Sequence, residues 1–302
     1  MKFNHIVLLL MLYICLSSYH SQTFVQSATN TPESIDPRGN RMLLGQTMRE
    51  KLQEEPFGQW FNKNYSDYRI DSGTANALRS QLKNKRFVIF MGTWCGDSRQ
   101  EIPGIYKVLD YCGVSASNIQ LINVNIYDSV YKQSPGREEK GLNIHRVPDL
   151  LVYQMHTELG RIVEKPVISW ESDLLAIVQG QNYEPNYKIV SYLHTLFQSR
   201  SLDKIENDIV KIADSFKANM TKNEGLQSYG SVLMAANENR KGMFVLQLNS
   251  MLFSSSANAF VSLGDAYLKI GKRFEAKQNY ERALTIQPGH EKAVAMLAQL
   301  MK

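Results

Sequence analysis

Reactive side chains are scarce in this sequence. Its 302 residues include only three cysteines, Cys15, Cys95 and Cys112, and six histidines. No two histidines are spaced as metal ligands usually are. A glycine-rich phosphate loop, a Gly-x-Ser-x-Gly turn and a Gly-x-Gly-x-x-Gly segment are missing. We therefore expect no metal site and no nucleotide or organic cofactor.

Blocks of like charge are also missing. The chain has 34 Lys and Arg residues against 29 Asp and Glu residues, a formal net charge of +5. The two signs are interspersed, as on an ordinary solvated surface, so nothing favours a nucleic-acid partner. A length of 302 residues accommodates two domains.

Residues 1–21 have the pattern of a secretory signal peptide. Lys2 precedes an apolar run over residues 6–16, and small polar residues follow it. The run is too short to span a bilayer comfortably, and we expect cleavage within residues 17–21. The protein is therefore expected to be exported, either periplasmic or extracellular. Lipid attachment at Cys15 is the alternative, and it would tie the protein to a membrane.

Residues 86–103 carry the clearest structural pattern. The apolar run Phe87–Met91 predicts a strand buried on both faces, as in a parallel sheet. Gly92 then turns the chain, and a helical pattern begins at Cys95. Its apolar positions are Ile102, Ile105, Tyr106 and Leu109. Cys95 is thus expected at a helix N-terminus, where free N–H groups and the helix dipole favour a thiolate over a thiol.

This segment resembles the active-site region of the thioredoxin family. The match includes the strand, the Trp-Cys-Gly start of the helix at residues 94–96, and Pro103 in the helix interior. Residues 144–148 resemble the family's cis-proline loop, which lies against the active cysteine and receives the substrate backbone. The resemblance implies an α/β, thioredoxin-like fold over about residues 56–180, with a cis bond before Pro148.

The sequence departs from the family at the redox motif. The family has Cys-x-x-Cys, whereas residues 95–98 read Cys-Gly-Asp-Ser, and the Ser98 hydroxyl cannot form an internal disulfide. Cys112 follows Cys95 by 17 residues, about 25 Å along a continuous helix. Bridged cysteines need Cα atoms within about 7 Å. We therefore predict a buried, unpaired Cys112 at the helix end.

Charged groups near the cysteine also differ from the family pattern. Ile89 occupies the strand position where the family often has a buried carboxylate. Asp97 adds a negative charge in the first turn of the helix, which opposes the effect of the dipole on Cys95. Asp149 follows Pro148, where the family commonly has Thr, and we expect it to bring a second acidic group near Cys95.

Two functions remain open on this pattern. The resemblance implies thiol–disulfide exchange through Cys95 with a protein or peptide substrate, followed by resolution by an external thiol. Cys95 and Ser98 would then be catalytic, with Ser98 donating a hydrogen bond to the sulfur. The residues expected at the substrate are Trp94, Gly96, Asp97, Val147 and Pro148. The alternative is a redox-inert protein-binding module, which Ser98 and Ile89 favour.

The C-terminal part has helical periodicity and a repeat. Residues 181–222 are expected to be a helical linker region with two apolar core stripes, Ile189, Tyr192, Leu193 and Leu196, and Ile205, Ile209, Ile212 and Phe216. Gly230 and Gly264 are 34 residues apart, and the positions around them match each other without a gap. This period resembles that of the tetratricopeptide repeat, over residues 223–302. The resemblance implies an all-α domain. Its use remains open between a groove for a protein partner and a cap that stabilises or dimerises the protein.

The remaining segments are assigned from local pattern. Residues 22–55 are expected to be a leader, with its first part loosely attached and a helix starting within 46–55. Aromatic residues in 57–68 are expected to pack on the sheet. Further predicted elements are helices at 72–83 and 170–178, strands at 119–124, 150–153 and 161–164, a short helix within 134–142, and a turn at 158–160.

Overall fold

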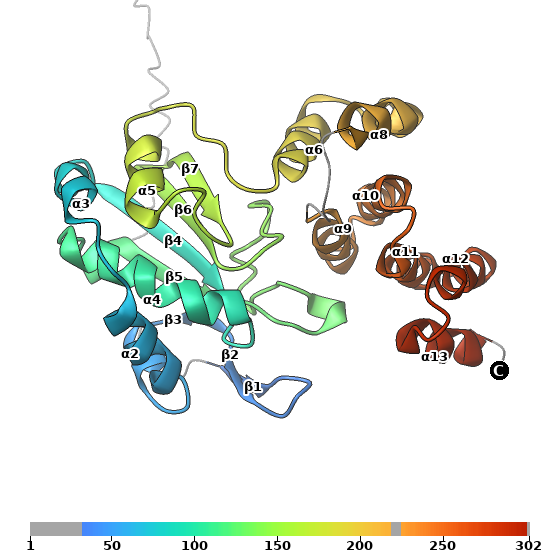
Figure 1. Ribbon diagram of the computed structural model, residues 1–302, viewed down its shortest axis with the longest axis horizontal. Coiled ribbons are helices and arrows are strands. Elements are labelled where there is room, and N and C mark those ends of the chain that lie inside the picture. Colours follow the sequence, from blue (N-terminus) through green and yellow to red (C-terminus); the bar gives the residue numbers. More distant parts are fainter. Residues whose placement is uncertain (1–31, 219–224, 301–302) are drawn as a thin grey trace, which may run out of the picture.

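The computed structural model describes residues 32–218 and 225–300 and consists of a mixed α/β part followed by an array of helices (Figure 1). The predicted signal peptide lies outside the described residues. Five strands form the main sheet in the order β3-β5-β4-β6-β7. These are β3 (Gly45–Thr47), β4 (Lys85–Met91), β5 (Ile119–Asn123), β6 (Asp149–Gln154) and β7 (Thr157–Val163).

Strand β4 is the centre of the sheet. It pairs in parallel with β5 and antiparallel with β6, so the sheet is mixed rather than all-parallel. Residues Phe87–Met91 are buried, which confirms the prediction of a strand covered on both faces. Because side chains alternate along a strand, β4 contributes to two separate apolar clusters.

One face of the sheet is covered by helices. Phe87, Ile89 and Met91 pack there against side chains of α2 (Gly58–Asp67), α3 (Ser72–Arg79), α4 (Gly96–Tyr111) and α5 (Trp170–Val178). The aromatic residues of α2 belong to this core, as predicted. On the other face, Val88 and Phe90 pack against the loop residues Ile144 and Val147, with Trp94 and Cys95 at the edge of the cluster. The sheet thus places the cysteine on the face that carries loops.

The leader prediction is wrong for residues 33–47. Strands β1 (Glu33–Ile35) and β2 (Arg41–Leu43) form a hairpin, and β3 pairs with β5 at the edge of the main sheet. Leu43 is fully buried, and its N–H donates to Thr93 Oγ1 at 3.1 Å. The expected helix is the short α1 (Glu50–Gln53), which buries Leu52. Strands of three residues carry too little pattern to be recognised in a polar context.

Two local predictions after β5 are also wrong. Residues 134–142 form turns instead of a helix, because the Ser134 hydroxyl binds Glu138 and Glu139 locally. The hairpin reverses at Met155, which has a positive φ of 55°, so residues 158–160 belong to β7. At Gly160 a Cβ would lie 3.1 Å from Ile177 of α5. This glycine therefore permits close packing of the helix and does not mark the turn. A short 3₁₀ turn covers Ala116–Asn118 and another covers Asp128–Val130.

The helical part consists of α6 (Lys188–Ser199), α7 (Leu202–Asn207), α8 (Ile209–Lys217), α9 (Leu226–Ala235), α10 (Asn239–Leu252), α11 (Ala257–Lys269), α12 (Arg273–Ile286) and α13 (Glu291–Leu300). Residues of α6, α7 and α8 share one apolar cluster with α9 and α10, so these helices stack together as predicted. Tyr192 is 43% exposed and does not belong to the core stripe. The second stripe is divided between α7 and α8 at Asp208.

The period of 34 residues is repeated in the packing. A Cβ at Gly230 of α9 would lie 2.5 Å from Leu246 of α10, and one at Gly264 of α11 would lie 2.7 Å from Tyr280 of α12. Each glycine thus lets the first helix of its pair approach the second. Both contact positions recur after 34 residues, as the sequence correspondence predicts.

Candidate functional site

Cys95 occupies the N-cap position of α4, between the end of β4 and the first helical turn. Its N–H donates to the Gly92 carbonyl at 2.9 Å, and its own carbonyl accepts from Arg99 N–H at 3.1 Å. A side chain at Gly92 is excluded, since a Cβ there would lie 2.4 Å from the Trp94 ring. That ring is fixed by a 2.8 Å hydrogen bond from Nε1 to the Val124 carbonyl. The turn therefore holds the thiol in a defined position.

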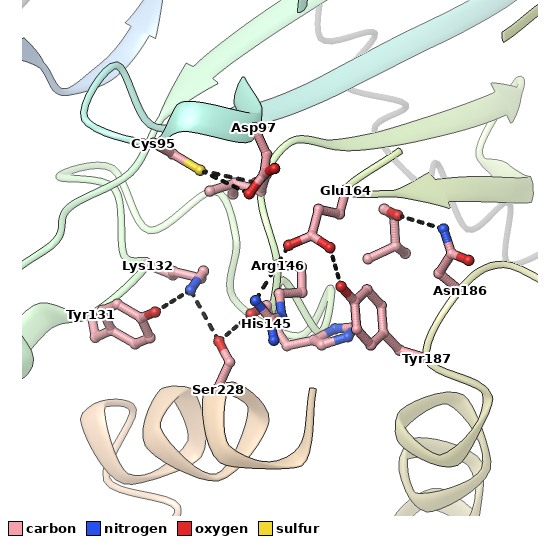
Figure 2. Close-up of polar contacts among 12 residues, drawn as sticks. Cys95, Asp97, Tyr131, Lys132, His145, Arg146, Glu164, Asn186, Tyr187 and Ser228 are labelled. Carbon is pink, nitrogen blue, oxygen red and sulfur yellow. Dashed lines mark hydrogen bonds and ion pairs between the residues drawn. The ribbon is translucent and has the colours of Figure 1, made fainter. Parts of the chain in front are cut away.

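The cis-proline loop lies against the sulfur. The Val147–Pro148 peptide bond is cis, as predicted, and Cys95 Sγ donates to the Val147 carbonyl at 3.4 Å (Figure 2). Cys95 is half-buried and free of any disulfide. Residues 52 positions apart in the chain therefore form one site.

The first turn of α4 brings two predicted residues close to Cys95. Asp97 is exposed, and its Oδ2 lies 4.0 Å from the sulfur, so a negative charge is present as predicted. Gly96 is also exposed, and a Cβ there would meet nothing within 4 Å, so the approach to the thiol from this side is open. Ser98 is fully buried, and its Oγ accepts from Gly92 N–H at 3.3 Å. The contact found for Ser98 thus stabilises the turn and does not reach the sulfur.

Asp149 is fully buried on β6, opposite Phe90 of β4. Its nearest cation is Arg161, with Nη1 at 3.6 Å from Oδ2, and neither carboxylate oxygen accepts a hydrogen bond from the described residues. Burial raises the pKa of Asp149 to about 7, although Arg161 acts in the opposite direction. The charged neighbours of this carboxyl are thus Arg161 and Glu158. We expected Asp149 to bring a negative charge near Cys95, but no contact between the two side chains is found among the described residues.

Cys112 occupies the C-cap of the same helix and is 5% exposed. Its Sγ donates to the Ala75 carbonyl at 3.6 Å, and burial raises the pKa of the Cys112 thiol. The prediction of a buried, unpaired cysteine is confirmed.

A buried lysine is the main feature that sequence reasoning missed. Lys132 is 4% exposed and follows the 3₁₀ turn after β5. Its Nζ donates to the Tyr131 hydroxyl and to Ser228 Oγ at 3.0 Å (Figure 2). The same Nζ lies 5.9 Å from the centroid of the Trp94 ring. Ser228 belongs to α9 and donates in turn to the His145 carbonyl. Nothing in the local sequence distinguishes Lys132 from the surface lysines.

The cis-proline loop carries a second polar cluster. Arg146 Nη1 lies 3.3 Å from Glu164 Oε1, and the Tyr187 hydroxyl donates to the same carboxylate (Figure 2). The His145 ring packs edge-on against Tyr187, with centroids 5.5 Å apart. Burial lowers the pKa of His145 to about 3, opposed by the hydrogen bond to the Asn143 carbonyl and assisted by the neighbouring cations, so this side chain is neutral at pH 7. The loop that faces the thiol is thus held by groups from both parts of the chain.

A cavity of about 1120 Å³ lies between the two parts. Its wall includes Tyr131 and Arg146 on one side and residues of α9, α11 and α13 on the other. The last group includes Ser228, and Lys292, which forms an ion pair with Asp265 at 2.7 Å. The cavity wall therefore includes Tyr131 and Ser228, the two residues whose hydroxyls accept hydrogen bonds from Lys132.

Protein-family models, curated proteins and solved structures were compared with this chain, and none of them matches it. In residues 32–218 and 225–300, His, Cys, Asp and Glu side chains form no group of three that is suited to hold a metal ion. No helix in that same part of the chain combines the length and apolar character needed to cross a membrane.

Proposed function

We propose that this chain is exported and that it carries out thiol–disulfide exchange through Cys95 as its single reacting sulfur. The observation that carries the proposal is the position of this sulfur. It is half-buried at the N-cap of a 16-residue helix and lies 3.4 Å from the carbonyl that precedes a cis proline. The dipole and free N–H groups of α4 favour its thiolate.

We further propose that the α/β part has a thioredoxin-like fold and that the helices from α9 onward are tetratricopeptide-like repeats. The first assignment is supported by the succession β4-α4-β5, then β6-β7-α5, with the cis proline immediately before β6. The second is supported by the recurrence of glycine packing at a period of 34 residues. The comparisons contribute to neither assignment.

The exchange takes place in two steps. The Cys95 thiolate attacks one sulfur of a protein or peptide disulfide, so a new S–S bond forms as the old one breaks and the second sulfur leaves as a thiolate. An external thiol, as its thiolate, then attacks the substrate sulfur of the mixed disulfide and releases Cys95. Cys112 is excluded as the resolving group, because its thiol is buried and bonded to Ala75. No net redox change occurs on the protein.

The substrate is oriented by residues around the sulfur. The backbone of Val147 and the open side at Gly96 allow an extended chain to approach, and Trp94 packs at the edge of the same apolar cluster as Cys95. Asp97 places a negative charge at the entrance. Ser98 stabilises the turn by accepting a hydrogen bond from Gly92 N–H, and it is a positioning residue in this proposal.

The test measures the rate at which iodoacetamide alkylates Cys95 at a series of pH values in a Cys112→Ala chain. The mass of the peptide that contains Cys95 reports the extent of reaction. We expect the midpoint of the profile to lie well below about 8.5, the value for a free cysteine. A midpoint at or above that value, or no reaction in the folded protein, would overturn the proposal.

A second function, protein binding without redox chemistry, is supported by the cavity between the two parts. Its volume and its mixture of hydroxyl, apolar and charged side chains suit a segment of a partner protein. The two functions separate experimentally. A binding module would retain a co-purifying partner in a Cys95→Ser chain, whereas a partner held by disulfide exchange would be lost from it.

A further inference from the structure

A buried cation next to Trp94, the neighbour of Cys95 in the chain, has no carboxylate partner among the described residues. Within residues 32–218 and 225–300, the contacts of Lys132 Nζ are two hydroxyl oxygens and two aromatic rings, and no ion pair joins it to Asp or Glu. Buried charges in proteins are normally paired, because desolvation penalises an isolated ion by several kcal/mol. An ammonium at this position is therefore stabilised by an anion other than a carboxylate.

Two acidic groups are available to Lys132, the Tyr131 hydroxyl and the Cys95 thiol. Burial lowers the pKa of Lys132, while the charges of Tyr131 and Cys95 raise it and that of Arg146 lowers it further. Burial also opposes ionisation of Tyr131, but the charge and hydrogen bond of Lys132 lower the pKa of Tyr131 below its usual range. Trp94 lies next to Cys95 in the chain, its ring faces Nζ, and both residues pack at the edge of the same apolar cluster.

We propose that Lys132 is a positioning residue whose ammonium stabilises the thiolate of Cys95, and that α9 holds it in place through Ser228. This inference rests on the proposed thiol chemistry and extends it to the helical part of the chain. Ser228 accepts a hydrogen bond from Lys132 and donates one to the His145 carbonyl, two residues before Val147. One hydroxyl of the helical part thereby fixes both the cation and the loop that faces the sulfur.

The other charges that face the thiol do not replace this cation. Asp97, on the helix of Cys95 itself, acts in the opposite direction at 4.0 Å. Arg146, on the cis-proline loop, is already paired with Glu164. Arg38, on the β1–β2 hairpin, donates to the Trp94 carbonyl at 3.1 Å and is paired with Asp36 at 3.7 Å. Its side chain is largely exposed, so solvent screens its charge.

The experiment compares Cys95 alkylation against pH in Lys132→Met with the same profile in Lys277→Met, both in the Cys112→Ala chain. Lys277 is an exposed residue of α12, so its substitution removes the same charge from a solvated surface. We expect Lys132→Met to move the midpoint upward by about one pH unit and to slow alkylation at pH 7 about tenfold. Lys277→Met should leave the profile unchanged.

Ser228→Ala keeps the cation and removes only the hydroxyl that holds it. We expect a shift in the same direction as for Lys132→Met, with alkylation at pH 7 slowed about threefold. This variant decides the question if Lys132→Met does not fold, as judged by circular dichroism. An unchanged profile in a folded Lys132→Met chain, or in Ser228→Ala where that chain is unfolded, overturns the inference and leaves Lys132 as a clamp between the two parts.

The same data separate this inference from the function on which it rests. If the parent chain itself has the profile of a free cysteine, the thiol chemistry fails and the role of Lys132 fails with it. If the parent midpoint is low and Lys132→Met does not move it, the chemistry stands and only the role of the lysine is refuted.

Discussion

Helix α4 begins after one cysteine and ends before another, and its two ends are built differently. Buried polar residues near the Cys95 end are Ser98, Lys132 and His145, and the buried Asp149 directly follows Pro148 in the chain. The Cys112 end lies in the apolar core formed by α2–α5 and the sheet. Identical thiols thus have different surroundings, although a buried carboxylate also acts on Cys112, whose pKa burial and Glu171 both raise.

The largest expected effect is the difference in reactivity between the two thiols. In the folded chain at pH 7, iodoacetamide should modify Cys95 at least about a hundredfold faster than Cys112, because Cys112 reacts only after local unfolding. Peptide mass spectrometry over time measures both rates in one sample. Equal rates would mean that the two ends of α4 do not differ chemically.

Asp149 provides a test of the polar end through stability. The pKa of Asp149 is about 7 when folded, against 3.8 for an unperturbed Asp. The folded state therefore keeps the proton that the unfolded state loses, and stability falls as pH rises through this window. In the parent, this titration should lower the free energy of unfolding by about 2–4 kcal/mol between pH 4 and pH 8. Asp149→Asn should remove that loss.

Urea unfolding at both pH values measures this change. Asp214→Asn, at an exposed position on α8, serves as the control and should keep the pH dependence of the parent. Parallel curves for the parent and Asp149→Asn would show that the buried carboxyl is not the source of the pH dependence.

Replacing each cysteine by alanine should affect stability unequally. Cys112→Ala removes a buried sulfur from the main core and should cost about 1–2 kcal/mol in the free energy of unfolding. Cys95→Ala removes a half-buried sulfur at the edge of the second cluster and should stay within about 0.5 kcal/mol of the parent. A larger cost at Cys95 would identify this thiol as a packing residue and weaken the functional contrast between the two ends.

The smallest effect concerns Asp97. Its carboxylate is exposed and lies 4.0 Å from the sulfur. Asp97→Asn should therefore speed Cys95 alkylation at pH 7 by about threefold and move the midpoint of the pH profile downward. The effect should shrink in 1 M salt, where exposed charges are screened. A slower reaction in the variant would contradict the sign assigned to this charge.

The sequence predicts the local parts of the site better than the long-range ones. The buried strand, the turn at Gly92 and the position of Cys95 follow from patterns within residues 86–109, and the buried Cys112 follows from helix geometry. The cis bond at Pro148 followed from a resemblance in a second short segment.

The parts that could not be predicted depend on packing between distant segments. Lys132 and Ser228 are 96 residues apart, and neither has a neighbour pattern that indicates burial. Strand β3 has three residues, too few for a periodicity to be recognised, and it is fixed by its pairing with β5. Gly160 has the composition of a turn but the environment of a strand packed under α5. Composition alone does not separate these cases.

The most direct test of the account is to expose the folded chain to oxidised glutathione and to map the adduct by peptide mass. We predict one glutathione on Cys95, none on Cys112, and complete release when a second thiol is added. A folded chain in which Cys95 stays free, or in which glutathione attaches to Cys112 first, would contradict the claim that Cys95 is the reacting thiol.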